Sequence, residues 1–529
     1  MYYPTKQEFI RKAGEGNLIP VWKEILADVE TPLSLFKRLD RGEFSFLLES
    51  VEKGERWGRY SFLGTNPSLV FKSKGQEVEI IERSENSPTA HPEQRNDEGS
   101  PYRNCRRKFK SAQPLAELKK FIFQYKPVEP PSLPYFWGGL VGYVSYDSVR
   151  FFEPILTTGD KNIDDLNLPD IFFILADEVL IFDHLEQKFK IVVNAHIPEE
   201  RRGEMPEDRL KKIYEQATKR IEQIIQEIGK PLREKPLPLS PNLKKKDWKS
   251  NFSQEGFKTA VSKAKERILQ GDIIQVVLSQ RWERELDCPP LNIYRALRCI
   301  NPSPYMFYLN FKEVKLIGSS PEILVRSQGR KAELRPIAGT RRRGEDPAED
   351  AELIKELLSD PKEKAEHIML VDLGRNDLGR VCEYNSISIQ ELMVIEKYSH
   401  VMHIVSQCEG RLRRDKDVFE LFKACFPAGT VTGAPKIRAM QIIEELEENK
   451  RGPYAGAVGY FGFSGNLDSC IAIRTILIKD SKVYIQAGAG IVADSQPERE
   501  YKETINKAEA MKEAVEMART WTEQNDFSN

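Results

Sequence analysis

Two acidic stripes on separate predicted helices are the residues of this 529-residue sequence whose types and spacing best suit chemistry. Glu363 and Glu366 are three residues apart, so they share one face of a helix. Glu500, Glu503 and Lys507 lie within about 60° of one another around a second helix. Each stripe alone is typical of a solvent-exposed face. If the stripes face each other across a cleft, they could hold a hard cation such as Mg²⁺, which takes one or two carboxylates with water and substrate oxygens.

Two glycine-rich segments could let the backbone approach a ligand. Residues 486–490 (Gln-Ala-Gly-Ala-Gly) follow a β-rich run and lack the third glycine and the helix of a dinucleotide fingerprint. Residues 429–436 (Gly-Thr-Val-Thr-Gly-Ala-Pro-Lys) resemble a phosphate loop only superficially, because no Gly-Lys-Ser/Thr follows. Pro435 indicates a helix to about Glu448, whose N-terminus suits a small anion such as a carboxylate; capping of that helix by Thr432 is an equally good interpretation.

Histidine and cysteine spacing argues against zinc and disulfide chemistry. The sequence contains neither a His-Glu-x-x-His motif nor a Cys-x-x-Cys pair. The seven cysteines are therefore expected to be reduced, buried thiols of a cytoplasmic protein. His367 and His400 lie in apolar-rich segments, where a packed histidine is commoner than a catalytic one. His403 lies in a predicted strand among the motifs and is the histidine to follow.

Composition excludes several classes of protein. Lys and Arg total 80 and Asp and Glu total 81, so charge gives no reason to expect nucleic acid or an anionic membrane as a partner. A hydrophobic content of 40% with 30% charged residues is typical of a folded protein. The N-terminal residues lack a signal peptide, and the longest apolar run, 171–182, is interrupted by Asp177 and Glu178. We therefore expect a cytoplasmic location and no membrane span.

The elements that must position the candidate residues are strands joined by short loops, with a few long helices. Asp360-Pro361 and Pro497 each predict a helix start ahead of an acidic stripe, and Gly271 is placed to end an earlier helix. Strands are predicted at 171–183 and 188–195, as a hairpin, and at 273–279, 305–310, 316–318, 386–390 and 401–409. This order favours an α+β fold with antiparallel sheets.

Two polar stretches divide the chain. Residues 82–113 are predicted to be a long exposed loop, an insertion. Residues 229–247 contain four prolines and three consecutive lysines and indicate a connector. We therefore predict an N-terminal, β-rich regulatory domain at 1–235 and a catalytic domain at 248–522.

Five segments together resemble the chorismate-utilising enzymes, and among them the anthranilate synthase component I group. They are residues 318–322 (Gly-Ser-Ser-Pro-Glu), 335–340 (Arg-Pro-Ile-Ala-Gly-Thr), 365–377 (Ala-Glu-His-Ile-Met-Leu-Val-Asp-Leu-Gly-Arg-Asn-Asp), 426–436 (Phe-Pro-Ala-Gly-Thr-Val-Thr-Gly-Ala-Pro-Lys) and 486–495 (Gln-Ala-Gly-Ala-Gly-Ile-Val-Ala-Asp-Ser). They span most of 250–515 in the family's order. The resemblance implies stacked antiparallel β-sheets flanked by helices, with a chorismate-binding cleft between sheet and helices.

The resemblance also implies roles for individual residues. Glu366 and Glu503 would bind Mg²⁺, supported through water by Glu363 and Glu500. Glu322 resembles the general acid for the C4 hydroxyl of chorismate, Thr430 would line the same pocket, and His403 resembles the histidine of the later pyruvate elimination. The implied chorismate contacts are Gly339, Thr340, Tyr454, Arg474, Gly488, Ala489, Gly490 and Lys507.

Two positions select among relatives. Water-using members, the isochorismate and salicylate synthases, carry a lysine where this chain has Gln275, and glutamine cannot activate water as a base. Aminodeoxychorismate synthases usually carry a nucleophilic lysine where this chain has Ala338. Both positions favour ammonia as the attacking species and anthranilate as the product. Since the chain lacks a glutaminase nucleophile motif, a separate glutamine amidotransferase subunit is the expected partner.

Tryptophan is the expected feedback inhibitor. Residues 47–50 (Leu-Leu-Glu-Ser) and 301–307 (Asn-Pro-Ser-Pro-Tyr-Met-Phe) match inhibitor-binding segments of the family, with Ser50, Pro304, Tyr305 and Met306 as contacts. Three alternatives stay open: an aminodeoxychorismate synthase subunit, a non-catalytic tryptophan-sensing subunit, and a structural α+β module whose acidic stripes are solvated.

Overall fold

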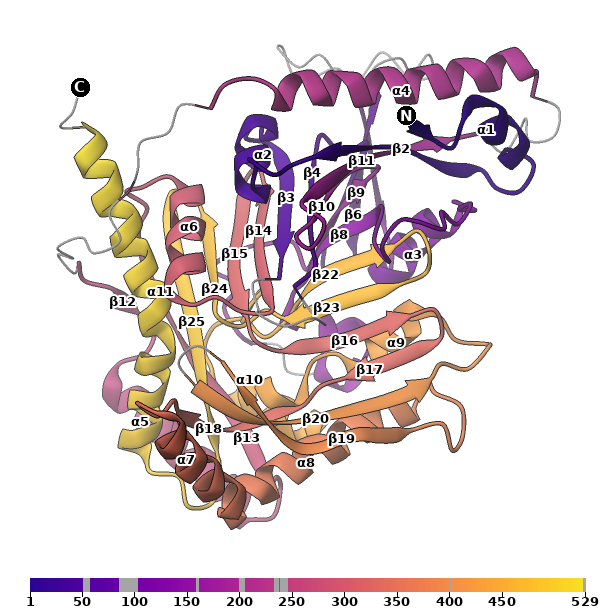
Figure 1. Cartoon of the computed structure of the whole chain (residues 1–529). Coiled ribbons are helices and arrows are strands. Elements are labelled where there is room, and N and C mark those ends of the chain that lie inside the picture. Colours follow the sequence, from indigo (N-terminus) through magenta and orange to yellow (C-terminus); the bar gives the residue numbers. More distant parts are fainter. Residues whose placement is uncertain are drawn as a thin grey trace.

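Two large antiparallel sheets form the centre of the molecule (Figure 1). The computed structural model describes residues 1–50, 58–84, 103–157, 161–198, 205–232, 237, 246–398 and 401–526. Within them, the first sheet follows the order β1 (Tyr2–Tyr3), β2 (Leu18–Leu26), β11 (Lys188–His196), β10 (Glu178–Asp183), β4 (Tyr60–Thr65), β3 (Phe44–Glu49), β14 (Tyr305–Phe311), β15 (Val314–Ser320), β24 (Thr475–Lys479), β25 (Lys482–Ile491), β13 (Gln275–Glu285) and β12 (Lys249–Ser250), with β21 (Gly433–Ala434) beside β13.

The second sheet packs face to face with the first. Its order is β18 (Ile337–Arg342), β20 (Val401–Arg411), β17 (Lys331–Leu334), β16 (Ile323–Gln328), β23 (Leu467–Ile471), β22 (Ala457–Gly462), β8 (Gly139–Val144), β9 (Ile171–Ala176), β5 (Leu69–Lys74), β6 (Glu77–Ser84) and β7 (Arg103–Lys110), with β19 (Ser388–Lys397) beside β20. Buried side chains of both sheets, such as Phe46, Phe172 and Phe311, form one core between them, because alternate residues of each strand face inward.

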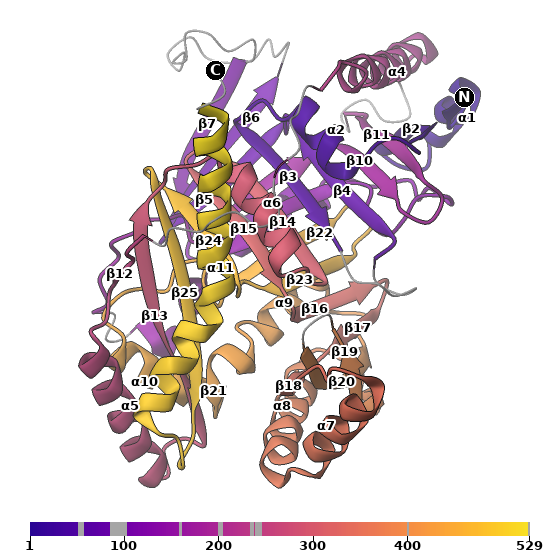
Figure 2. The same ribbon diagram turned by 60° about the vertical axis from the view of Figure 1, so that its left-hand side comes forward.

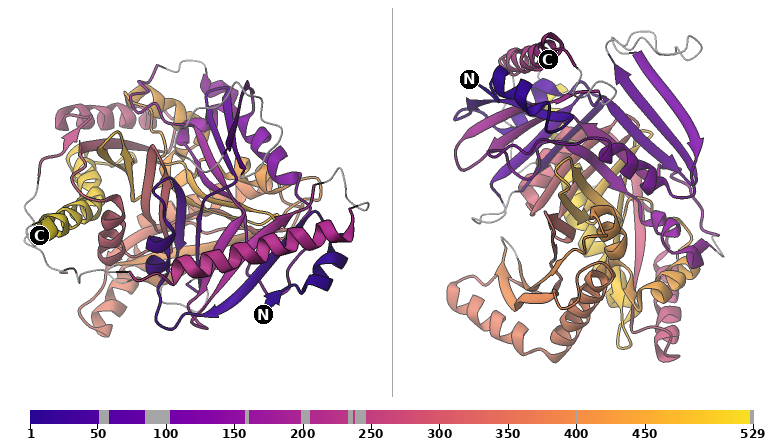
Figure 3. Two further views of the ribbon diagram at one scale, coloured as in Figure 1. Left: turned by 90° about the horizontal axis from the view of Figure 1, so that it is seen from above. Right: turned by 90° about the vertical axis from the view of Figure 1, so that its right-hand side faces the viewer.

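Helices cover the outer faces. A second core joins the first sheet to α1 (Lys6–Lys12), α2 (Pro32–Leu39), α4 (Glu207–Ile228), α6 (Pro290–Ile300) and α11 (Pro497–Asp526). Seen from above, α4 crosses the top of this sheet (Figure 3, left). In the other half, α5 (Gln254–Leu269) and α10 (Lys436–Leu446) pack on β13, while α7 (Pro347–Ser359) and α8 (Pro361–Gly379) pack on β18 and β20. The shorter α3 (Pro114–Phe123) and α9 (Val418–Cys425) adjoin the second sheet.

The predicted fold class is confirmed, as are the hairpin of β10 and β11 and the two helix starts. Asp360 caps α8 by accepting hydrogen bonds from the amides of Lys362 and Glu363, with Pro361 as the first helical residue. The α5 helix ends ahead of Gly271, whose φ of +82° favours glycine. No helix in the described ranges is long and apolar enough to cross a membrane.

Several local expectations were wrong. Residues 82–84 and 103–110 are not loop but belong to β6 and β7, which pair antiparallel from Glu77 with Lys110 to Ser84 with Arg103. Residues 85–102 lie outside the described part. Residues 486–490 are the interior of β25 rather than a loop after a strand. The division at 235–248 remains a prediction: both sheets take strands from both of its sides.

Candidate active site

The two acidic stripes lie on two separate helices, α8 and α11 (Figure 2). Burial raises the pKa of Glu366 on α8, and the charges of Glu363 and of Glu503 on α11 raise it further. The pKa of Glu500 is raised by burial and by the charge of Glu503. The charge of Glu503 on α11 thus acts on Glu366 on α8, and a cation site between the two helices stays a prediction.

These carboxylates fit a magnesium ion held partly by water and substrate. In the described part of the chain, no three His, Cys, Asp or Glu side chains already form a metal cage. Mg²⁺ does not need one, because it is usually bound by one or two carboxylates plus water and substrate oxygens. Glu363 is already paired with Arg341 (3.0 Å), which suits an indirect role. The Gln275 amide donates to Glu366 at 3.4 Å and orients it.

Glu322 is placed to act as an acid. It lies between β15 and β16, directly before Ile323, and burial raises the pKa of its carboxyl to about 7, against an ordinary value of 4.5. The Thr430 hydroxyl and the Lys507 ammonium lie near enough to lower that pKa in part. Thr430 Oγ1 is buried and has no hydrogen bond of ordinary geometry, so it can reorient toward a substrate. A carboxyl that titrates near neutrality can donate a proton to a leaving hydroxyl.

Lys507 joins the acid to the acidic stripe of its own helix. Its ammonium forms an ion pair with Glu503 (2.7 Å) and donates to the carbonyl oxygen of Gly488 (3.1 Å). The main-chain oxygen of Lys507 accepts a hydrogen bond from Arg474 (2.9 Å). Arg474 has a φ of +51°, an uncommon conformation for a non-glycine residue, and this turn directs its side chain back toward α11. Two cations beside one acid suit a substrate with two carboxylates.

The glycines of β25 let neighbouring side chains approach the strand closely. A Cβ added at Gly488 would lie 2.9 Å from the Tyr454 hydroxyl, and one at Gly490 would lie 2.8 Å from the Gln275 amide nitrogen. Ala489 alternates to the other face, where its side chain is fully buried in the core under α5 and α10. Only the backbone of Ala489 can therefore adjoin the site.

His403 faces the same region from β20. Its Nδ1 lies 3.0 Å from the Thr340 hydroxyl and 3.2 Å from the Gly339 carbonyl oxygen. Burial lowers the pKa of His403, and the charge of Arg474 lowers it further, so the imidazole is neutral near pH 7. With Nδ1 donating to Gly339, Nε2 remains available as a base. His367, in contrast, is buried against the Ser406 hydroxyl (2.6 Å), as expected for a packed histidine.

Comparison with known proteins decides the family. The chorismate binding enzyme family matches residues 62–513. The chain belongs to this family. It is 48% identical over 517 residues to anthranilate synthase component 1 of Aquifex aeolicus, covering 97% of each chain, and 49% identical over 523 residues to that of Acetivibrio thermocellus, covering 98% of this chain and 99% of the relative. The resemblance read from the five motifs is confirmed.

Solved structures agree. The crystal structure of anthranilate synthase component I from Streptococcus pneumoniae superposes with a TM-score of 0.72 at 35% identity, over 92% of this chain and 99% of that one. The menaquinone-specific isochorismate synthase of Escherichia coli has a TM-score of 0.67 at 19% identity, over 96% and 98% of the two chains, which shows a shared fold. The stacked antiparallel sheets are thus the architecture of this family of chorismate binding enzymes.

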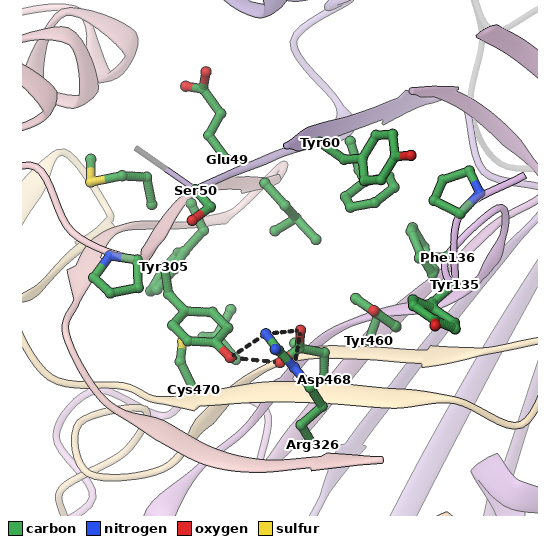
Figure 4. Close-up of a pocket in the computed structure, with 18 of the residues that line it drawn as sticks. Glu49, Ser50, Tyr60, Tyr135, Phe136, Tyr305, Arg326, Tyr460, Asp468 and Cys470 are labelled. Atoms are coloured by element: carbon green, nitrogen blue, oxygen red, sulfur yellow. Dashed lines mark hydrogen bonds and ion pairs between the residues drawn. The ribbon is translucent and has the colours of Figure 1, made fainter. Parts of the chain in front are cut away.

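A cavity of about 280 Å³ lies between the two sheets (Figure 4), and no residue of the acidic stripes lines it. All four predicted inhibitor contacts line it: Ser50, Pro304, Tyr305 and Met306. The buried Ser50 hydroxyl has no hydrogen-bond partner among the described residues, so it is available to a ligand. Figure 4 also shows Tyr60, Phe136 and Tyr460 around the cavity, which gives it an aromatic wall.

The sequence did not predict the polar cluster at the base of this cavity. The Tyr305 hydroxyl donates to Asp468 (2.7 Å), and Arg326 donates to both groups (3.0 Å each). A charged residue at an inward-facing position of a strand, as Arg326 is in β16, was the available signal.

Capping of α10 by Thr432, one of the two interpretations of this segment, is wrong. The Thr432 hydroxyl donates to the Ala428 carbonyl oxygen, and Pro435 is the N-cap.

Proposed function

We propose that this chain is the large subunit of an anthranilate synthase, which converts chorismate and ammonia to anthranilate and pyruvate in tryptophan biosynthesis. The observation that carries this proposal is the ion pair of Lys507 with Glu503. The proposal is supported because the Lys507 ammonium also acts on the pKa of the Glu322 carboxyl, while the charge of Glu503 acts on the pKa of Glu366 on α8. A non-catalytic sensing subunit or a structural module would not require these groups to lie together.

The proposed reaction has two steps, amination of the ring and elimination of pyruvate. Lys507 and Arg474 bind the carboxylates of chorismate, and protonated Glu322 gives its proton to the C4 hydroxyl, which leaves as water while ammonia forms a bond to C2. Neutral His403 then takes the C2 proton through Nε2, and the C3–oxygen bond breaks as the ring becomes aromatic. The released enolpyruvate takes up a proton and becomes pyruvate. Glu366 and Glu503 would hold Mg²⁺, which would neutralise and orient the ring carboxylate.

Ammonia rather than water is the nucleophile. The Gln275 side chain is engaged with Glu366 and has no basic group to activate water. Ala338 on β18 cannot attack the ring. The chain carries no glutaminase chemistry of its own, so a glutamine amidotransferase subunit is the proposed source of ammonia. At high pH, ammonium salts should replace that subunit, because free ammonia is then abundant.

Tryptophan is the proposed inhibitor at the inter-sheet cavity. The volume and aromatic wall of the cavity fit an indole, and the Ser50 hydroxyl fits the polar amino acid end. Because the cavity lies apart from the acidic stripes, tryptophan would act by shifting the enzyme toward a state with lower chorismate affinity.

Product analysis tests the whole proposal. The purified chain is incubated with chorismate, Mg²⁺ and ammonium at high pH, with and without tryptophan, and the product is identified by mass and fluorescence. Anthranilate and pyruvate in equal amounts support the proposal. Aminodeoxychorismate would instead identify the nearest rival enzyme, and the absence of turnover together with tryptophan binding would identify a sensing subunit.

A further inference from the structure

A buried ion pair lies directly beneath the candidate active site. Arg451 and Glu447 are fully buried, with side-chain exposures of 1% and 4%. Arg451 Nε donates to Glu447 Oε2 (2.9 Å), and Nη2 donates to Oε1 (2.6 Å), so the pair is bidentate. Nothing in the reaction described above uses either residue.

The remaining hydrogen bonds of the pair end on segments that carry site residues. Arg451 Nη1 donates to the carbonyl oxygen of Val431 (2.8 Å), which follows Thr430 in the chain. Arg451 Nη2 donates to the carbonyl oxygen of Val277 on β13 (2.7 Å), two residues from Gln275. The pair therefore fixes the Thr430 segment against the strand that orients Glu366.

Glu447 holds β13 a second time, and through it β25. Its Oε1 accepts hydrogen bonds from the amide (2.8 Å) and the hydroxyl (2.9 Å) of Ser279. The same hydroxyl accepts a hydrogen bond from Gln486 Nε2 on β25 (2.9 Å). Ser279 pairs in register with Gly488, the glycine whose carbonyl oxygen receives Lys507. One ion pair thus reaches three of the strand and loop segments that form the site.

The Arg451 guanidinium also lies near Tyr454, a predicted chorismate contact. The Arg451 guanidinium carbon lies 5.8 Å from the centre of the Tyr454 ring and 4.7 Å from that of Tyr146, so the cation is enclosed by two aromatic faces. Tyr454 follows Arg451 by three residues, and the amide of the intervening Gly452 donates to Asp147 (2.7 Å). The turn that delivers the Tyr454 hydroxyl to Gly488 is therefore anchored at the ion pair.

Stability alone does not explain such a pair. Removing two charges from water costs several kcal/mol per ion, and well-packed apolar residues often serve as well or better in a core. The hydrogen bonds that the two side chains make beyond the pair, however, all end on segments that carry a site residue. We propose that Arg451 and Glu447 are positioning residues, which hold Thr430 and Tyr454 at fixed distances from β13 and so keep chorismate aligned with Glu322. This inference rests on the proposed function.

A matched pair at the far end of the same strand provides the control. Arg284 on β13 pairs with Glu516 on α11 (2.6 Å), with side-chain exposures of 5% and 4%, and this pair lies farther along both elements than their site residues Gln275 and Lys507. Arg451→Lys and Arg284→Lys each remove a guanidinium from a buried ion pair, so both should lower the melting temperature. We expect Arg451→Lys alone to lower kcat, by about 10- to 100-fold, as for a reacting group displaced by about 1 Å. Equal loss of kcat in both variants would overturn the proposal.

An apolar double variant separates positioning from stability. Arg451→Met with Glu447→Leu removes both charges together and should restore much of the melting temperature lost by the single variant. The proposal predicts that kcat stays low in this variant; recovery of kcat together with stability would refute it.

A structural readout is independent of turnover. Crystal structures of the wild-type chain and of Arg451→Lys should differ in the position of residues 429–432, whereas Arg284→Lys should leave them in place. An unmoved segment in Arg451→Lys overturns the positioning role even if the wild-type chain forms no anthranilate. Failure of the wild-type chain to turn over chorismate, with the segment displaced in the variant, would instead refute only the proposed function.

Discussion

The hydroxyl of Ser320 donates a hydrogen bond to the main-chain carbonyl oxygen of Ile471 (2.7 Å). The Ile471 amide in turn donates to the carbonyl oxygen of Glu322, the candidate acid (3.0 Å). Ser320 is paired in register with Tyr305, and Cys470 precedes Ile471; both Tyr305 and Cys470 line the inter-sheet cavity. Two hydrogen bonds at Ile471 thus connect Ser320, next to the wall of the proposed tryptophan site, with Glu322, the acid of the proposed reaction.

Replacement of Ser320 by alanine should weaken inhibition more than it weakens tryptophan binding. The change removes the cross-link between the cavity wall and Glu322 while leaving the cavity lining intact. Coupling between two sites typically corresponds to about 5- to 150-fold in affinity, and a loss of part of it should raise the tryptophan concentration for half-inhibition several-fold. Calorimetry measures binding and anthranilate fluorescence measures inhibition. Ser469→Ala, which removes a buried hydroxyl bond to Val325 (2.9 Å), is the control, and a parallel loss of binding and inhibition in Ser320→Ala would contradict the route.

Ser50→Arg should abolish the tryptophan response. The Ser50 hydroxyl is buried at the cavity, and an arginine there would fill the space with a long charged side chain. Anthranilate formation without tryptophan should stay near the wild-type rate, because the cavity is separate from the acidic stripes. Ser50→Ala, which creates no clash, should keep a weakened response. Unchanged inhibition in Ser50→Arg would remove the inhibitor from this cavity.

The sequence predicted local features of the site well because they depend on neighbours in the chain. The N-cap Asp360 and the spacing of Glu363 and Glu366 are set within one helical turn, so both the helix start and its acidic face are confirmed. The apolar run at 171–183 was likewise recognisable as strand, but the structure divides it at Asp177 into β9 and β10, which belong to different sheets. These signals need no knowledge of which elements meet in space.

Long-range pairings could not be predicted in the same way. Glu322 becomes an acid through burial near Thr430, which is 108 residues away in the chain, and nothing local to the Ser-Ser-Pro-Glu segment indicates that burial. The polar stretch 82–113 looked like a loop because charged residues of β6 and β7, such as Glu82 and Arg107, pair across an exposed hairpin. A solvated strand and a loop have similar composition, so only the register of the partner strand distinguishes them.

Glu322→Gln should lose activity and gain stability. The acid must be protonated to act, and its pKa is about 7, so wild-type kcat should fall about tenfold for each pH unit well above 7. Because the folded-state pKa exceeds the ordinary value of 4.5, the native state binds the proton more tightly, and its stability decreases as pH rises from about 4.5 to 7. Glutamine avoids this cost, and at pH 8 the variant should be more stable by up to about 3 kcal/mol. Urea unfolding at pH 5 and pH 8 measures the difference, and equal stability gains at both pH values would argue against a raised pKa.

Glu503→Gln should abolish activity and weaken the response of the protein to Mg²⁺. This variant tests whether the carboxylates of α8 and α11 bind the ion. The metal-free site places like charges of α8 and α11 across from each other, so a bound cation should relieve repulsion and raise the melting temperature of the wild-type chain. The variant has one fewer charge at this point and should show little rise with Mg²⁺. Glu498→Gln is the matched control, since Glu498 lies in the first turn of the same helix but pairs with Lys258 (2.5 Å) away from the stripe. If Mg²⁺ raises the melting temperature equally in the wild type, Glu503→Gln and Glu498→Gln, then the ion binds elsewhere, and the carboxylates of α8 and α11 act on chorismate without it.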